Sequence, residues 1–98
     1  MPEVEIYTRM MCGYCSAAKS LLKRKGAKFK EHDASYNQEL RAEMRKKTNG
    51  ASTFPQIFIG GRHIGGCDEL HALEGTGQLD GLLGIEPETT EATETEGS

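Results

Sequence analysis

The stretch of sequence that decides the fold is residues 4–15, VEIYTRMMCGYC. Val4, Ile6 and Thr8 take every second position in its first half, which is the period-2 pattern of a β-strand. Beyond the CxxC motif, apolar residues recur at helical spacing as far as Leu22, with lysines on the opposite face. The two cysteines therefore lie where a strand ends and a helix begins.

The rest of the chain predicts an α/β domain with elements in the order β-α-β-α-β-β-α. The first helix stops near Gly26, and residues 27–33 form a weaker strand. Tyr36, Leu40 and Met44 lie four apart and predict a second helix of about three turns. In such layouts, binding sites gather at the carboxyl ends of strands and at helix N-termini, which is where the CxxC motif lies.

The second half of the chain adds a hairpin and a helix. Residues 56–59 and 62–64 are expected to be antiparallel strands joined by a Gly-Gly turn. Asp68 is in position to cap a third helix that carries Leu70 and Leu73. A short last helix is expected over residues 79–83.

The 98 residues carry a formal charge of −3, but the acidity is concentrated at one end. Residues 86–98 hold five glutamates, no basic residue and almost no apolar side chain, so we expect a disordered acidic tail behind one domain at residues 1–85. No stretch approaches the roughly 20 apolar residues that a membrane helix needs, and no leader pattern is visible. We therefore expect a cytoplasmic protein.

The CxxC motif, Cys12 and Cys15, is suited to thiol-disulfide exchange, which requires a thiolate. Cys12 lies at a helix N-terminus, where the orphan N–H groups and the helix dipole favour negative charge, and Arg9 adds a cation nearby. Cys15 lies one helical turn further along, where it can attack a mixed disulfide on Cys12. Cys12 is thus the expected nucleophile and Cys15 the resolving thiol.

A zinc site is the alternative interpretation of these cysteines. Structural zinc needs four ligands, and Cys67 with His71 could supply the remaining two. The sequence context favours redox chemistry, because Phe54-Pro55 precedes a strand. A proline at this point, often cis, brings backbone opposite the reactive sulfur in redox folds.

Three segments, YTRMMCGYC, STFPQIFIGGRHIGG and GGCDEL, together resemble a glutaredoxin of the small bacterial dithiol class. The resemblance spans roughly Val4 to Ile85. It implies a thioredoxin-like fold, a four-stranded mixed sheet flanked by helices. Thioredoxin itself fits less well, because the chain has no Trp and Met11 stands immediately before the CxxC motif.

The same resemblance implies a glutathione site. The backbone of Phe54 would pair with the tripeptide, with Thr53 and Pro55 beside it, and Tyr14 would line the groove. Cys67 and Asp68 match the pocket for the γ-glutamyl end, while Arg9 and Gln56 match positions that hold the glycyl carboxylate. Each residue also has an ordinary structural interpretation: Asp68 as a helix cap, Cys67 as a buried apolar residue, Arg9 as a solvated charge, Gln56 as a strand residue. His32, His63 and His71 show no partner pattern.

Three positions depart from the family pattern. Phe54 stands where the family's usual TVP segment has valine, a change of little consequence if the contact is made through backbone. Gly13 replaces the common proline of CPYC, and glutaredoxins with another residue there include some that bridge a [2Fe-2S] cluster between two protomers, in which Cys12 would be the metal ligand. Ala51 replaces a basic residue often found before the TVP segment, for which Lys46 or Lys47 could substitute.

The sequence thus predicts a glutathione-dependent thiol-disulfide oxidoreductase that reduces protein disulfides and protein-glutathione mixed disulfides. Its partners would be glutathione and disulfide-bearing or glutathionylated proteins, with no nucleic acid or membrane. The expected state is a monomer. A cluster-bridged dimer acting as an iron-sulfur carrier or sensor is the alternative.

Overall fold

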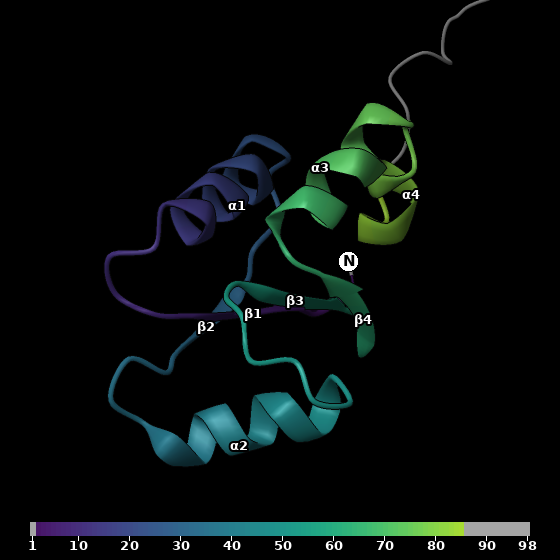
Figure 1. Ribbon diagram of the computed structural model, residues 1–98. Helices are drawn as coiled ribbons and strands as arrows, with labels where there is room; N and C mark the ends of the chain where they lie inside the picture. Colours follow the sequence, from purple (N-terminus) through teal and green to yellow (C-terminus); the bar gives the residue numbers. More distant parts are fainter. Residues whose placement is uncertain (1, 86–98) are drawn as a thin grey trace, which may run out of the picture.

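A computed structural model describes residues 2–85, and the tail expected at residues 86–98 lies outside the described residues (Figure 1). The elements follow in the order β1 (Val4–Thr8), α1 (Gly13–Arg24), β2 (Lys30–Asp33), α2 (Gln38–Lys47), β3 (Gln56–Ile59), β4 (Arg62–Gly65), α3 (Cys67–Gly75) and α4 (Leu79–Leu83). This confirms the predicted order. None of the helices in the described range is long and apolar enough to cross a membrane.

The four strands form one mixed sheet in the order β2-β1-β3-β4. β1 runs parallel to β2, whereas the β1–β3 and β3–β4 pairs are antiparallel. The crossover helix α1 makes the parallel pairing possible, and the two-residue turn makes the β3–β4 hairpin. Gly60 and Gly61 both have positive φ, 59° and 81°, as a tight hairpin turn of this kind requires.

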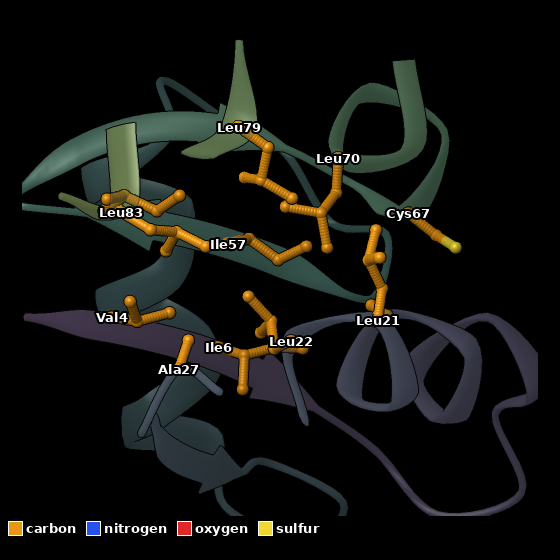
Figure 2. Close-up of a cluster of buried hydrophobic side chains, with 12 residues drawn as sticks. Val4, Ile6, Leu21, Leu22, Ala27, Ile57, Cys67, Leu70, Leu79 and Leu83 are labelled. Atoms are coloured by element: carbon orange, nitrogen blue, oxygen red, sulfur yellow. The ribbon is translucent and has the colours of Figure 1, made fainter. Parts of the chain in front are cut away.

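Helices cover both faces of the sheet: α1, α3 and α4 lie on one side and α2 on the other (Figure 1). Figure 2 shows the larger core between the sheet and the three-helix side, where Leu22, Leu70 and Leu79 meet Ile6 and Ile57. Each of these five side chains is fully buried. Burying a side chain of this size stabilises a fold by about 1.5–3 kcal/mol relative to leaving it in water.

The α2 side has a smaller core made of Tyr7, Phe58 and Met44. Tyr7 points to the face opposite Ile6, as the alternation along β1 requires, and it is completely buried because α2 covers it. Its hydroxyl donates to the Glu43 carboxylate and accepts a 3.1 Å hydrogen bond from Lys47 Nζ. β1 is therefore buried on both faces at its carboxyl end, next to the cysteines.

Three sequence-based boundaries were wrong. β2 begins at Lys30 rather than at residue 27, because the Ala27 N–H is taken by the Leu22 carbonyl, which closes the end of α1. α2 begins after Asn37, whose side chain accepts a hydrogen bond from the Leu40 N–H, and Tyr36 lies outside the helix, 88% exposed. Asp68 does not cap α3, since the cap is Gly66.

Candidate active site

Cys12 and Cys15 lie at the start of α1 and are joined by a disulfide, with their Cα atoms 5.2 Å apart. Cys12 is the N-cap residue, and its sulfur accepts a 3.1 Å hydrogen bond from the Cys15 N–H. This sulfur thus takes the place that a Ser or Asp oxygen usually occupies at a helix N-terminus, where negative charge is favoured. Cys12 is half-buried whereas Cys15 is only 2% exposed, so Cys12 is the sulfur that an incoming molecule reaches.

The segment before β3 lies opposite Cys12. The Phe54–Pro55 peptide bond is cis, as the sequence context suggested, and the Phe54 carbonyl oxygen lies 4.0 Å from the Cys12 sulfur. Pro55 is buried, while Thr53 is exposed. Phe54 is half-buried and lines the groove described below, so this segment lies between that groove and the reactive sulfur.

A groove of about 530 Å³ runs from this segment to the start of α3, a volume within the usual range for small-molecule sites. It contains seven of the eight residues expected at the glutathione site: Tyr14, Thr53, Phe54, Pro55, Gln56, Cys67 and Asp68. These residues come from α1, the loop before β3, β3 itself and α3, and the fold brings them together.

Arg9 is the expected residue that does not line this groove. It lies in a separate hollow with Met10, Met11 and Cys12, and its guanidinium donates to the Met10 carbonyl at 3.3 Å. Lys47, one of the two candidate substitutes for the missing basic residue, contacts the core instead: its ammonium lies over the Phe58 ring, 4.6 Å from the centroid. Neither Lys46 nor Lys47 lines the groove.

The start of α3 is held by one half of a capping box, because the N-cap residue Gly66 has no side chain to supply the other half. The Glu69 carboxylate accepts a hydrogen bond from the Gly66 N–H at 2.7 Å, so Glu69 does the capping that sequence reasoning gave to Asp68. Asp68 lies in the first turn with its side chain exposed to the groove. Its carboxylate is therefore free of the capping role and can face a ligand.

Gln56 and His63 form a pair that sequence reasoning missed. His63 Nε2 lies 2.7 Å from Gln56 Oε1, and both residues line the groove. The signal was present in the hairpin: His63 pairs with Phe58, which makes Gln56 its diagonal cross-strand neighbour. His32 also has partners, because it hydrogen-bonds to Glu5 and stacks on Tyr7.

Cys67 is 8% exposed and belongs to the larger core, at the edge of the cluster in Figure 2. Burial raises the pKa of its thiol, and the charges of Asp68 and Glu69 act in the same direction. A thiol that resists ionisation is a poor nucleophile. This environment agrees with the structural interpretation of its side chain.

The zinc interpretation finds no set of ligands within the described part of the chain. No group of three or more His, Cys, Asp and Glu side chains there is placed to hold a metal ion. Cys12 and Cys15 are bonded to each other, while the Cys67 sulfur faces His71. The two halves of the postulated site are not assembled.

A CxxC pair at the N-terminus of the first helix, opposite a cis-proline on a four-stranded mixed sheet, defines a thiol-disulfide oxidoreductase of thioredoxin-like fold. Comparison with known proteins narrows the class. The chain matches the glutaredoxin family model over residues 4–64. The chain belongs to the glutaredoxin family.

The chain covers at least three quarters of the length of each relative compared below. Glutaredoxin of Pseudomonas aeruginosa is 55% identical over 83 residues, which are 85% of this chain and 98% of that protein. The solution structure of glutaredoxin from Brucella melitensis is 60% identical, with a TM-score of 0.74 over 85% of this chain and 89% of that one. A crystal structure of a buckwheat glutaredoxin-glutathione complex is 30% identical, with a TM-score of 0.77 over 85% and 77% of the two chains.

Proposed function

We propose that this glutaredoxin uses glutathione to reduce protein-glutathione mixed disulfides and protein disulfides. The observation that carries the proposal is the groove beside Cys12, which is lined by seven of the residues that the family pattern assigns to glutathione. A related protein of 30% identity has been solved in complex with glutathione. Glutathione offers two carboxylates, an ammonium and two amides, and the groove is lined by Phe54, the N-terminus of α3 and Asp68.

Deglutathionylation needs only one cysteine of the enzyme. The Cys12 thiolate attacks the glutathione sulfur of the mixed disulfide, a Cys12–glutathione bond forms, and the protein thiolate leaves and takes up a proton. The thiolate of a second glutathione then attacks the bound glutathione sulfur. Glutathione disulfide leaves, and Cys12 returns to the thiolate that its helix N-terminus favours.

Reduction of a protein disulfide uses both cysteines. The Cys12 thiolate attacks one sulfur of the substrate, the substrate S–S bond breaks, and the other sulfur leaves as a thiolate that takes up a proton. Cys15 then loses its proton and attacks the Cys12 sulfur of the mixed disulfide, so that the second substrate thiolate leaves and the Cys12–Cys15 disulfide forms. This disulfide is the form that the structure holds. Two glutathione molecules reduce it again and leave as glutathione disulfide.

The two routes are separated by single substitutions. We expect Cys12→Ser to abolish reduction of both a glutathionylated peptide and a disulfide-bonded protein. Cys15→Ser should keep deglutathionylation and lose most disulfide reduction. The matched control is Cys67→Ser, which removes the third thiol and should leave both activities near the wild-type level. Substantial activity of the Cys12 variant would refute the mechanism.

A second candidate function is [2Fe-2S] binding, and one observation favours it. Gly13 is exposed beside Cys12, nothing lies within 4 Å of the place where its Cβ would be, and glycine puts no side chain into that space next to Cys12. In this function Cys12 would supply one sulfur ligand per protomer, with the others coming from glutathione and a second chain. Anaerobic reconstitution with iron, sulfide and glutathione tests it: a brown dimer that Cys12→Ser abolishes supports cluster binding, and a colourless monomer refutes it.

The proposal also includes a cellular compartment and an oligomeric state. We place the protein in the cytoplasm as a monomer whose partners are glutathione and disulfide-bearing or glutathionylated proteins. Reduced glutathione is abundant in that compartment, and thiols there stay reduced. Fractionation of the native cells with sizing of the fraction that holds the protein would test both points together.

A further inference from the structure

The hydrogen bonds around Gln56 determine which of its side-chain atoms faces which neighbour. Its Nε2 lies 3.1 Å from the Thr53 carbonyl oxygen and 3.1 Å from Thr53 Oγ1. A carbonyl oxygen can only accept, so the atom that faces it must be the amide nitrogen. The Gln56 oxygen therefore faces His63, and His63 Nε2 must carry the hydrogen that it donates over 2.7 Å.

This assignment leaves Gln56 with little freedom to bind a ligand itself. Both N–H groups of the amide point back to Thr53, three residues earlier, and the side chain is 5% exposed. Gln56 is thus better placed to hold the Thr53-Phe54-Pro55 segment in shape than to donate to a carboxylate. His63 holds Gln56 in turn, with its own ring tilted against Phe58 at 5.1 Å between centroids.

We infer that His63 is a positioning residue of the glutathione groove, acting through Gln56 on the Thr53-Phe54-Pro55 segment. The inference rests on the proposed function, because this segment is the one whose backbone would pair with glutathione. The Phe54 carbonyl lies 4.0 Å from the Cys12 sulfur, so a shift of the segment changes the groove beside the reacting atom. Without the donor of His63, the buried Gln56 oxygen loses its partner and the amide is free to turn.

The test compares two substitutions of His63. His63→Phe keeps a flat ring against Phe58 and removes the donor, whereas His63→Gln keeps a donor and removes the ring. With a glutathionylated peptide as substrate and saturating glutathione, we expect His63→Phe to raise KM about three- to tenfold, the loss of roughly one hydrogen bond, and to leave kcat within about twofold. His63→Gln should restore KM to within about twofold of wild type.

The split between KM and kcat excludes a merely structural effect. Partial unfolding lowers the concentration of active enzyme and therefore kcat, without moving KM. The matched control is His32→Phe, because His32 also pairs with an acceptor, Glu5, and stacks on an aromatic ring, but it does not line the groove. We expect its KM to be that of wild type.

A double-mutant cycle tests whether His63 acts through Gln56. If it does, His63→Phe adds nothing to the KM of Gln56→Ala. An undiminished effect in that background would mean that His63 touches the ligand directly, which overturns the positioning role. NMR of the Gln56 amide protons gives a second measurement that needs no substrate: His63→Phe should remove their protection from exchange, and unchanged protection would overturn the inference.

Two outcomes of these assays distinguish an error in the role of His63 from an error in the proposed function. If the wild-type protein reduces a glutathionylated peptide no better than the same peptide carrying a cysteine mixed disulfide, glutathione recognition fails and the inference fails with it. If wild type prefers the glutathionylated peptide but His63→Phe keeps its KM, only the role of His63 is overturned.

Discussion

The sulfur of Cys67 lies 3.3 Å from Nδ1 of His71, one turn further along α3. This pair does not form a nucleophile-base dyad, because the same Nδ1 lies 2.9 Å from the Cys67 carbonyl oxygen. The carbonyl can only accept, so Nδ1 carries a hydrogen and cannot take the thiol proton. Burial also keeps the pKa of Cys67 above its usual value of 9.0.

Alkylation of the reduced protein should therefore be selective. Because burial raises the pKa of the Cys67 thiol and hides its sulfur, we expect iodoacetamide to modify Cys12 at least roughly tenfold faster than Cys67 at pH 7. Peptide mass spectrometry of samples quenched over time measures both rates. In denaturant the difference should disappear, since all thiols are then equally exposed. Equal rates in the folded protein would contradict the structural role of Cys67.

Two leucines of the short helix α4, Leu79 and Leu82, are buried to different extents in the core. Leu79 is fully buried, while Leu82 on the same helix is only partly buried. Leu79→Ala should lower the free energy of unfolding by about 2–4 kcal/mol, because it removes buried methyl groups and leaves a cavity. Leu82→Ala should cost less than about half as much. Chemical denaturation followed by circular dichroism checks the pair, and equal losses would show that α4 does not pack as the structure has it.

Local sequence patterns predicted most helices and strands of the fold correctly. The Gly60–Gly61 turn predicted the β3–β4 hairpin, and the alternation along β1 placed Ile6 and Tyr7 on opposite faces. The errors arose where backbone hydrogen bonds or side-chain caps override periodicity. Tyr36 continues the four-residue spacing of Leu40, but the Asn37 side chain caps the helix after it. Periodicity does not report such caps.

The groove was predictable only in part. The sequence motifs predicted that residues 53–56 and the start of α3 form one site, and the fold brings them together. They could not show that Lys47 lies over Phe58, because this contact joins α2 to a strand that the sequence places nine residues later. Nor did they give the direction of the Gln56 amide, which depends on a histidine in the next strand. Contacts of this kind follow from packing rather than from spacing.

Glu5 should make the stability of the protein sensitive to acid. Its pKa is lowered from 4.5, first by the hydrogen bond from His32 and also by the nearby charge of Lys47. A carboxyl whose pKa is lower in the folded state than in the unfolded state contributes its full stabilisation at pH values above the unfolded-state pKa. This contribution is lost as the pH falls through the folded-state pKa. The loss therefore occurs below pH 4.5. The free energy of unfolding of wild type should exceed that of Glu5→Gln by about 1 kcal/mol or less at pH 7, and the difference should be smaller at pH 3.

Urea denaturation of the two proteins at both pH values measures this difference. Glu5→Gln should still lose stability in acid, because the pKa of Glu31 is also lowered, mainly by the hydrogen bond from the Thr8 hydroxyl. Glu3→Gln serves as the control, since Glu3 is an exposed acidic residue outside β1. If the advantage of wild type over Glu5→Gln were the same at pH 7 and pH 3, the His32–Glu5 bond would not carry the effect.

Position 65 requires glycine because of both its backbone conformation and the side chain packed against it. Its φ is +121°, and a Cβ there would lie 2.8 Å from the Cγ of Glu69, the residue that caps α3. Gly65→Ala should therefore cost more than Gly61→Ala, for which φ is +81° but nothing lies within 4 Å of the added methyl. We expect about 1–2 kcal/mol for Gly61→Ala, and roughly 1–3 kcal/mol more for Gly65→Ala as the cap is displaced. Thermal unfolding compares the two variants, and equal losses would mean that Glu69 moves aside without cost.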